Sequence, residues 1–577
     1  MPQPDHVREP QEDAVADTFG VLVRLFFSRF FDKESLSPQG DPGANVVQTL
    51  GILAAPGGFI SLLLYFNPQI KTGWNLVSVR CLFLWLSMVV TGFVVIFEWD
   101  ALFLDRRDYQ VLLPLPLPLW RVFLAKMAAF LLFLGLFLAA INGAATFFWP
   151  SVFESGNIPG IIGTHLLIVL LSGLFSAFAA ASIQGLLLMI VPARLFRPVA
   201  TCVQTILMTI LVMLFFLSPL LAGFIQPAVA AFYGLARYVP AYWYAGLYEQ
   251  LRPTTGSHAL LDLGRMALPG LGCAVALFAL THIPGYRWQM LRLIETPPSN
   301  PSGPGRFRSA LNTVVDRLLL KNPVEQAVYH FIGQTISRSM KHRLFLAVYA
   351  GFGAALVVFN LGQAFVTTGV GPEFRVTGFV PDYAMLLRIP LTLSFVLITG
   401  LRAAFSFPAE LNANWSFQIS DTNRAADCLS AVRKWTIVCG VIPLFLLLVP
   451  AELQFLSGTD VLFQTLYGTT LSLLLLEAML AGFRKIPFTC GYFPGKNNLV
   501  LVLAVYVGSL ALYSSDWMTD LELRLMKDPL RAAGFFCVAL LLWMALWKRR
   551  SRAGTERGLD YDGDIDPVIR TLGLRPQ

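Results

Sequence analysis

Long apolar segments alternate with short polar ones along most of the chain. A helix that crosses a membrane needs about 20 mostly apolar residues, and twelve segments approach that requirement. They are 46–66, 81–98, 122–148, 161–191, 199–224, 266–284, 343–363, 384–402, 435–450, 461–483, 498–513 and 531–547. The pattern predicts an all-α, polytopic membrane protein with about 12 transmembrane helices.

A stretch rich in Pro, Ser and Gly at 295–309 divides these segments into two sets of six. Such a composition is typical of a flexible linker. Because an even number of spans returns the chain to the same side, the second set keeps the orientation of the first, which predicts a parallel pseudo-repeat. The predicted parts are a cytoplasmic N-terminus at 1–45, a first six-span half at 46–294, a cytoplasmic linker at 295–342, a second six-span half at 343–548 and a cytoplasmic tail at 549–577.

Lysine and arginine gather in alternate polar segments, as the positive-inside bias requires. The basic segments are 106–126, 194–197, 287–343, 424–434, 484–496 and 548–552, whereas 149–160 and 451–460 contain neither residue type. This asymmetry predicts cytoplasmic N- and C-termini and a multi-pass protein of the cell membrane, either inner or plasma.

An amphipathic helix is predicted before each set of six spans. Apolar residues recur at helical spacing in 19–30 and again in 324–336. Helices of this kind lie in the headgroup plane of a membrane. The alternative is a cytosolic helix that packs on protein, and the position directly before spans favours the interfacial helix.

The composition agrees with a membrane protein and argues against nucleic-acid binding. Hydrophobic residues make up 56% of the 577 residues and charged residues only 14%, with a mean hydropathy of +0.63, whereas soluble domains average about 25% charged. The net charge of +8 comes from basic residues beside apolar spans, so it reflects topology. Seven cysteines without a CxxC spacing indicate neither a zinc site nor a disulfide framework.

No catalytic constellation is found in the chain. The nearest string to a phosphate-binding loop is GYFPGKN at 491–497, which has three residues between its glycines and Asn where Ser or Thr is needed. The six histidines are dispersed, and no pair has metal-ligand spacing on a helix face. The chain is therefore not expected to be an enzyme or to hold a cofactor or metal.

Few polar side chains occur inside the predicted spans. Ion coupling would need charged or unwound polar groups at mid-membrane, where buried charge is expensive. The candidates for a translocation pathway are Asn142, Gln184, Gln204, Asn360 and Glu477. The alternative for the amides is hydrogen bonding between helices, and the alternative for Glu477 is a pair with a nearby Arg, Lys or polar group. For each of these residues, the structural role is favoured over a place on a translocation pathway.

Two charged loops occupy matching places, each after the second span of its half. The first, 98–126, holds the acidic–basic run DRRD, followed by prolines at 114, 116 and 118; the second is 410–434. Alternating prolines cannot continue an α-helix, so a short helix around 100–110 has to stop before the chain returns to the membrane. The other interpretations are a solvated connector and a proline-rich ligand of an adaptor domain.

The string DRRDYQVLLPLPLPLWRVFLAK resembles the first cytoplasmic loop of ATP-binding-cassette (ABC) exporter permeases of the type-2 class. In that family a charged stretch precedes a short proline turn, and the next span begins with a basic residue. The helices before each set of spans and the outer segment 226–256, between spans five and six, also fit the family layout. In the second half, SDTN at 420–423 stands in place of the proline turn.

The resemblance implies a transport subunit with two fused halves, driven by two copies of a separate ABC ATPase that binds ATP and Mg²⁺. Alternating access would move a hydrophobic or amphipathic substrate, in the export direction. The implied outer segment is expected to form short helices whose tyrosines lie at the water–lipid interface. The residues expected to couple to the ATPase are Asp105, Arg106, Arg107, Asp108, Tyr109, Trp415, Gln418, Asp421 and Asn423.

Two other function classes remain open at this point. The first is a secondary transporter without an ATPase, which the scarcity of charge in the spans disfavours. The second is a non-transporting membrane scaffold or a lipid-modifying protein. An ATPase partner would discriminate the permease from both.

Overall fold

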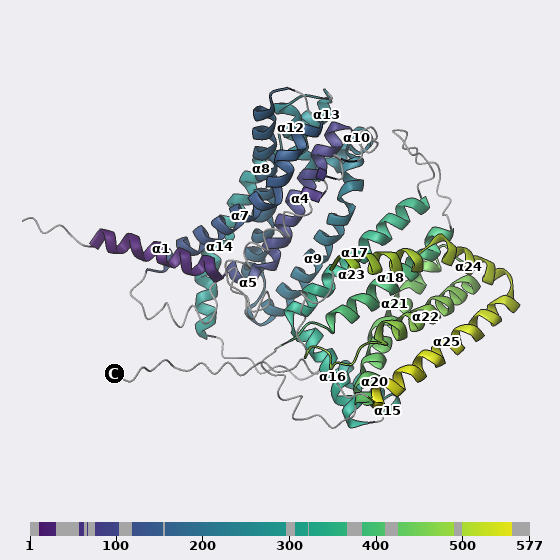
Figure 1. The fold of residues 1–577 in the computed structure, drawn as a ribbon. Coiled ribbons are helices and arrows are strands. Elements are labelled where there is room, and N and C mark those ends of the chain that lie inside the picture. Colours follow the sequence, from purple (N-terminus) through teal and green to yellow (C-terminus); the bar gives the residue numbers. More distant parts are fainter. Residues whose placement is uncertain are drawn as a thin grey trace, which may run out of the picture. The chain divides into compact units, whose positions relative to one another are not determined.

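The computed structural model describes residues 11–29, 57–59, 61–62, 66, 75–102, 118–153, 156–254, 256–295, 306–320, 322–365, 383–409, 425–489 and 499–556. The regular elements in this part of the chain are all helices. The chain divides into two compact units, Met1–Asn300 and Pro301–Gln577, which are coloured from purple to teal and from teal to yellow in Figure 1. The boundary falls inside the Pro-, Ser- and Gly-rich stretch.

Unit 1 is built around one buried helix, α4. Its helices are α1 (Gln11–Arg29), α4 (Leu76–Phe97), α5 (Trp99–Leu102), α7 (Leu119–Phe153), α8 (Ile158–Ile190), α9 (Ala193–Gly223), α10 (Ile225–Ala231), α11 (Tyr233–Ala236), α12 (Pro240–Leu251), α13 (His258–Gly264) and α14 (Ala267–Glu295). Helices α7, α8, α9 and α12 all pack on α4. Because 94% of its apolar window is buried, α4 is the centre of the core.

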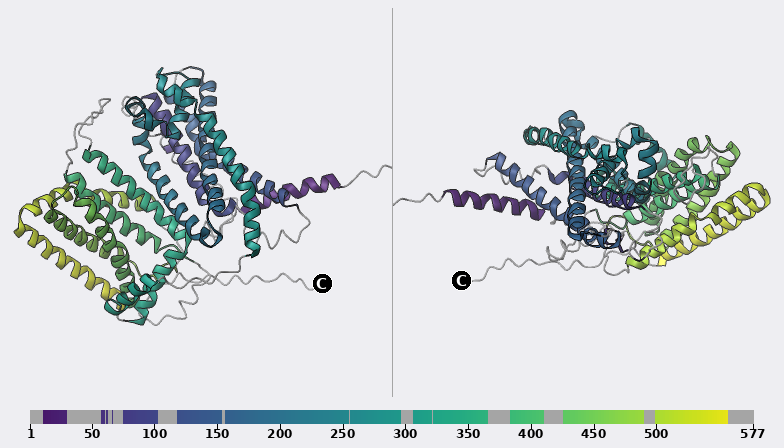
Figure 2. Two further views of the ribbon diagram at one scale, coloured as in Figure 1. Left: turned by 180° about the vertical axis from the view of Figure 1, so that it is seen from behind. Right: turned by 90° about the horizontal axis from the view of Figure 1, so that it is seen from above.

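Unit 2 is built in the same way around α18. Its helices are α15 (Arg306–Leu318), α16 (Pro323–Arg338), α17 (Met340–Phe365), α18 (Tyr383–Ala404), α20 (Ala425–Thr436), the π-helix η2 (Ile437–Val441), α21 (Ile442–Glu452), α22 (Gly458–Leu480), α23 (Leu499–Tyr513), α24 (Asp516–Lys527) and α25 (Pro529–Glu556). Helices α17, α21, α22, α23 and α24 pack on α18. Helix α25 lies at the edge in each view of Figures 1 and 2.

Ten described helices are long and apolar enough to cross a membrane, which is typical of a multi-pass membrane protein. Ten of the twelve predicted spans coincide with them. The predicted span 46–66 lies mostly outside the described residues. The span 498–513 is α23, a helix of 15 residues that is too short to count among the ten, so the total of twelve stays a prediction.

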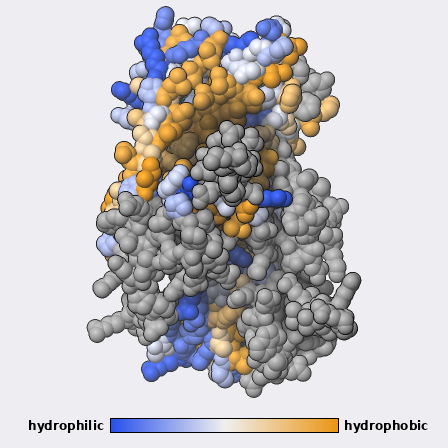
Figure 3. Space-filling view, turned by 90° about the vertical axis from the view of Figure 1, so that its left-hand side faces the viewer, coloured by the Kyte–Doolittle hydropathy of each residue, from blue (hydrophilic) through white to orange (hydrophobic). Residues whose placement is uncertain are grey.

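Hydrophobic side chains cover much of the molecular surface, as a lipid-facing protein requires. They form a broad area below a hydrophilic edge in Figure 3. In unit 2, α25 exposes Leu530, Val538, Leu541 and Leu542, and only 11% of its apolar window is buried. In water such an area would be unusually large for a monomer.

The two predicted amphipathic helices correspond to α1 and α16, and each packs on the helix of the third predicted span of its half. Helix α1 lies on α7, and α16 lies on α20. Phe26 of α1 and Ile332 of α16 are buried in these contacts. Packing on protein, the alternative for both helices, is therefore present. Helix α1 also exposes Val21 and Leu25, so lipid contact on that side stays a prediction. Helix α15, inside the predicted linker, was not expected.

The third long helix of unit 2 contains a π-helical turn, for which Pro443 gives a physical reason. A proline at position 443 has no N–H and clashes with the carbonyl of Cys439, four residues earlier. The chain accommodates it by widening one turn, in which the Ile442 N–H donates to the Ile437 carbonyl, five residues back. This turn joins α20 to α21.

Candidate functional site

The expected ATPase-coupling residues, Asp105, Arg106, Arg107, Asp108, Tyr109, Trp415, Gln418, Asp421 and Asn423, lie outside the described residues. The helix ends that carry the two loops are described. The first loop leaves after Leu102 and returns at Pro118, and the second leaves after Ala409 and returns at Ala425. The geometry of these ends is therefore what the structure contributes to the candidate coupling site.

Two glutamine amides hold the junction of α4 and α5, which leads into the first loop. Gln184 Nε2 donates to the Trp99 carbonyl and Gln204 Nε2 donates to the Ile96 carbonyl, both at 2.7 Å. The amides of α8 and α9 thus bond two backbone carbonyls at the junction of α4 and α5, that of Ile96 in the last turn of α4 and that of Trp99 at the start of α5. Trp99 itself is 1% exposed. The loop thus begins from a fixed point.

Asn142 joins three helices by hydrogen bonds. Its Nδ2 donates to Ser87 Oγ at 3.1 Å and to the Leu138 carbonyl at 3.0 Å. Ser87 Oγ in turn donates to the Val169 carbonyl of α8 at 2.9 Å. Asn360, in α17, is buried. For Asn142, Gln184 and Gln204 the helix-joining alternative is therefore present, and a place on a translocation pathway stays a prediction.

Glu477 forms an ion pair with Arg433, as its structural interpretation predicted. Its Oε1 lies 2.8 Å from Arg433 Nε, and its side chain is 1% exposed. The Arg433 guanidinium also lies over the ring of Trp543, 4.9 Å from the centroid. These contacts join α20, α22 and α25. The charge of Glu477 is neutralised within the protein, so ion transport is not needed to account for it.

In both units, a lysine on the helix of the third predicted span contacts the preceding amphipathic helix. In unit 1, Lys126 Nζ of α7 lies 5.4 Å from the ring centroid of Phe26 in α1. In unit 2, Lys434 Nζ of α20 donates to both carboxylate oxygens of Glu325 in α16 at 2.8 Å. Each lysine is the last residue of one of the two candidate coupling loops, 98–126 and 410–434. The lysine contacts an aromatic ring in unit 1 and a carboxylate in unit 2, but in both units it joins the amphipathic helix to the helix of the third predicted span.

A backbone clip holds the start of the second loop. The Phe488 N–H donates to the Phe405 carbonyl at 3.0 Å, and the Ala409 N–H donates to the Phe488 carbonyl at 2.9 Å. Phe488 has a φ of 67°, a region that bulky residues rarely adopt, and its ring is 1% exposed. His342 Nε2 adds a bond of 3.1 Å to the Phe407 carbonyl. The segment 405–409 is therefore held from two sides.

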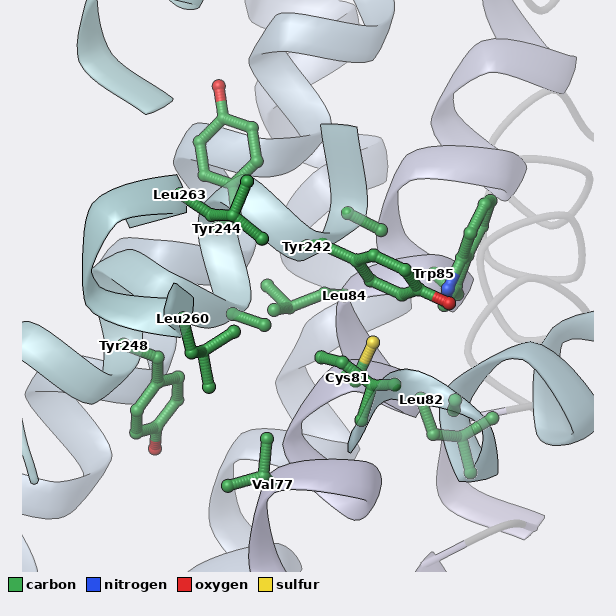
Figure 4. Close-up of a cluster of buried hydrophobic side chains, with 14 of the residues drawn as sticks. Val77, Cys81, Leu82, Leu84, Trp85, Tyr242, Tyr244, Tyr248, Leu260 and Leu263 are labelled. Atoms are coloured by element: carbon green, nitrogen blue, oxygen red, sulfur yellow. The ribbon is translucent and has the colours of Figure 1, made fainter. Parts of the chain in front are cut away.

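At the opposite end of unit 1, the expected outer segment 226–256 forms helices α10, α11 and α12, which confirms that it consists of short helices. Its tyrosines differ from expectation. Tyr242, Tyr244 and Tyr248 are buried against α4, α8 and α13, as Figure 4 shows, whereas Tyr238 is 75% exposed. Burial raises the pKa of the Tyr242 and Tyr244 hydroxyl groups.

The close approach of two glycines accounts for this burial. A Cβ on Gly246 would lie 2.2 Å from the Leu260 carbonyl oxygen and 2.5 Å from the backbone nitrogen of Gly264. Helices α12 and α13 can therefore meet backbone to backbone. The hairpin they form packs into unit 1 as part of its core, which removes its tyrosines from lipid.

Arg80 fastens this hairpin to the beginning of α4. Its guanidinium lies 4.2 Å from the ring centroid of Tyr248, its Nη1 lies 3.7 Å from Glu249 Oε2, and Nη1 donates to the Arg252 carbonyl at 3.1 Å. The side chains of Arg80 and Glu249 are 3% and 1% exposed. Sequence reasoning missed both residues, although an arginine near the start of an otherwise apolar helix is a signal for a buried partner.

Unit 2 repeats this attachment with different residues. Arg388, near the beginning of α18, forms an ion pair with Asp516 at the beginning of α24. Tyr467 of α22 donates its hydroxyl to the Met518 carbonyl at 3.1 Å. In both units an arginine of the central helix therefore holds a short helix that comes before the last long one. The pair in unit 2 is the weaker, because Asp516 is 82% exposed.

No protein-family model, curated protein or solved structure matches this chain. Among the described residues, no group of three or more His, Cys, Asp or Glu side chains is placed to hold a metal ion. The functional conclusion rests on the sequence and on the geometry above.

Proposed function

We propose that the chain is the membrane permease of an ABC exporter, with two fused six-span halves and two copies of a separate ATPase as its partner. The substrate is hydrophobic or amphipathic, and alternating access moves it. ATP and Mg²⁺ bind to the partner. When the ATPase dimer closes, the loops 98–126 and 410–434 approach one another and the two halves rock around a central pathway.

One observation carries this proposal: the two units have the same pattern of helix contacts around the two loops. The helix before the bundle packs on the helix of the third predicted span in both, as α1 on α7 and α16 on α20. A lysine of that span's helix lies at each contact, Lys126 in α7 and Lys434 in α20. A duplicated permease requires the same attachment beside each coupling loop, and a scaffold does not.

The fixed helix ends beside the loops support coupling. Force applied to a loop moves the membrane helices only if the loop is joined to them without slack. Gln184 and Gln204 provide such a junction for the first loop, and the Phe488 clip provides one for the second. The Arg433–Glu477 pair also removes the clearest candidate for ion coupling, which disfavours the secondary transporter.

Co-purification tests the proposal directly. The full chain, extracted in a mild detergent from its own host, should carry an ABC ATPase, and reconstituted protein should show ATP-dependent transport of an amphipathic dye. Absence of an ATPase together with dye movement that needs only an ion gradient would support the secondary transporter instead.

Charge reversal tests the loop. Arg106→Glu with Arg107→Glu should abolish ATPase association while the protein still inserts, because a broken, desolvated charge pair costs roughly 2–5 kcal/mol. The matched control is Arg524→Glu with Lys527→Glu on α24, where both side chains are exposed. If the loop variant keeps the ATPase while Arg194→Glu with Arg197→Glu loses it, the coupling loop is the wrong one.

The proposed topology places both termini in the cytoplasm and α12 and α24 on the outer side. Cysteines introduced into a cysteine-free variant at Gly156, Gly256 and Gly371 should react with an impermeant reagent added outside. Cysteines at Asp108, Gly303 and Gly554 should not. Outside labelling at Gly303 would overturn the division into six and six spans.

A further inference from the structure

A glutamate occupies the middle of the buried face of α24. Thr519, Glu522 and Leu525 recur at helical spacing and are 0%, 0% and 5% exposed. Asp520, Arg524 and Lys527 are exposed on the other side of the same helix. An apolar residue would be expected at position 522. A fully buried carboxyl group at this position needs a partner or a proton.

The corresponding helix of unit 1 shows what a partnered glutamate looks like. Glu249 of α12 accepts hydrogen bonds from the Thr254 N–H at 2.6 Å, the Thr254 hydroxyl at 2.7 Å and the Gly256 N–H at 3.3 Å, and it lies 3.7 Å from Arg80. Such a set of donors favours the ionised form. By contrast, neither oxygen of Glu522 has a hydrogen-bond partner among the described residues.

In the part of the chain that the structure describes, no ion pair joins Glu522 to a cation. Helices α18, α22 and α25 pack on α24. Arg388 of α18 pairs with Asp516, and Arg531 of α25 pairs with Asp528. Tyr467 of α22 faces Glu522, and its hydroxyl group donates a hydrogen bond to the Met518 carbonyl. The hydroxyl of Tyr513, beyond Tyr467 on α23, contacts Ser394.

A second carboxylate acts on Glu522 through its charge. Glu452, at the end of α21, raises the energy of a negative charge on Glu522, and its own Oε1 is buried without a hydrogen-bond partner among the described residues. A like charge disfavours the ionised form of a buried carboxyl group, so Glu452 adds to the effect of burial and favours the protonated form of Glu522.

We propose that Glu522 is a proton-binding site at the α24 end of unit 2. Glu522 holds the proton at neutral pH, and this neutral form allows α24 to pack into the bundle. Burial and the charge of Glu452 raise the pKa of Glu522 to about 9, in agreement with the geometry. The site goes beyond the proposed transport function and exists whether or not an ATPase drives the protein.

Loss of this proton favours release of α24. The ionised Glu522 would face Glu452 in an apolar core, and moving α24 outwards would return it to water. The polar attachments that oppose this movement are the Arg388–Asp516 pair, which is exposed on one side, and the Tyr467 bond. The helix is therefore poised to leave the bundle when the proton is lost.

Infrared difference spectroscopy of the purified full-length protein in lipid nanodiscs tests the site. The wild type should show the C=O stretch of a protonated carboxylic acid at pH 7, and the band should be lost as the pH is raised through about 9. Glu522→Gln should lack this band, and Asp520→Asn, an exposed carboxylate of the same helix, should keep it. A band that is equal in Glu522→Gln and wild type overturns the proposal.

A second variant keeps the test valid if Glu522→Gln does not fold. Glu452→Gln should abolish the band if the proton resides on Glu452, but should retain it with a midpoint at lower pH if Glu522 holds the proton and the charge of Glu452 acts on it. The proposal expects the lower midpoint. A wild type without the band at pH 7, whose thermal stability rises with sodium or potassium chloride, would identify a cation site and overturn the proton site. Neither result depends on an ATPase.

Discussion

Lys434 Nζ lies 2.8 Å from both carboxylate oxygens of Glu325, and this pair joins α20 to α16. The same lysine donates to the Leu319 carbonyl at 2.9 Å, at the end of α15. One ammonium group therefore connects three helices next to the second candidate coupling loop. Its removal affects the position of the amphipathic helix before it affects the membrane core.

Replacing Lys434 with Ala should destabilise unit 2 by about 1.5–3 kcal/mol, the usual contribution of hydrogen bonds to a charged group. Glu325, whose side chain is 6% exposed, would be left without this cation. Thermal unfolding of the protein in detergent measures the effect. Lys527→Ala, at an exposed position of α24, should change stability little. Equal effects of both substitutions would contradict the structural role of the pair.

Arg80 and Arg388, which hold the short helices, should contribute different amounts to the free energy of unfolding. Arg80→Ala removes one partner of a buried pair and should cost about 3–5 kcal/mol, whereas Arg388→Ala breaks a pair with an exposed Asp516 and should cost about 0–1 kcal/mol. The two variants control for each other in the same unfolding assay. A larger loss for Arg388→Ala would reverse the assigned order.

The α12–α13 contact should not tolerate a side chain at position 246. Gly246→Ala would place a Cβ 2.2 Å from the Leu260 carbonyl oxygen, and overpacking of this kind costs about 1–3 kcal/mol. Gly234→Ala, in α11, meets nothing within 4 Å and should be neutral. Protease sensitivity of the segment 226–256 reports whether the hairpin has left the core. Unchanged protection in Gly246→Ala would show that the hairpin can shift to make room.

The buried Glu522 should make stability fall as the pH rises. Below roughly pH 4.3, the ordinary pKa of a glutamate, the folded and unfolded chains both hold the proton. Between there and about pH 9, only the folded chain holds it, so each increase in pH favours unfolding. Wild-type melting temperatures measured from pH 5 to 9 should therefore decline. Glu522→Gln should reduce this decline of the melting temperature with pH. An unchanged slope in the variant would contradict a proton held by Glu522.

The long apolar helices could be predicted from the sequence because hydropathy over about 20 residues is a strong signal. Helices α4, α8 and α18 begin and end within a few residues of the predicted spans. The burial of Tyr242 and Tyr244 could not be predicted in this way. An aromatic residue suits both a lipid interface and a protein core, and the choice depends on the Gly246–Gly264 approach, which is a tertiary contact.

The candidate sites show the same limit. The pairing of Glu477 with a nearby arginine was predicted because a buried charge has few alternatives. The roles of Gln184 and Gln204 were harder to predict, since a polar amide in an apolar span can face a pathway or another helix. Glu522 was missed because α24 falls between spans. The run DWMTDLELRLMK contained the signal, a glutamate on the apolar face.

The π-helical turn at Ile437–Val441 determines which way both ends of the third long helix of unit 2 face. One extra residue in a turn rotates all that follows by about 100° relative to an uninterrupted helix. Arg433 precedes the turn and meets Glu477; Glu452 follows it and lies near Glu522. Deleting Gly440 from this turn would leave every apolar side chain of the helix in the chain, yet it would turn Arg433 or Glu452 away from its present direction. The π-helical turn therefore sets the rotation about the helix axis of the residues after it, Glu452 included, relative to Arg433 before it.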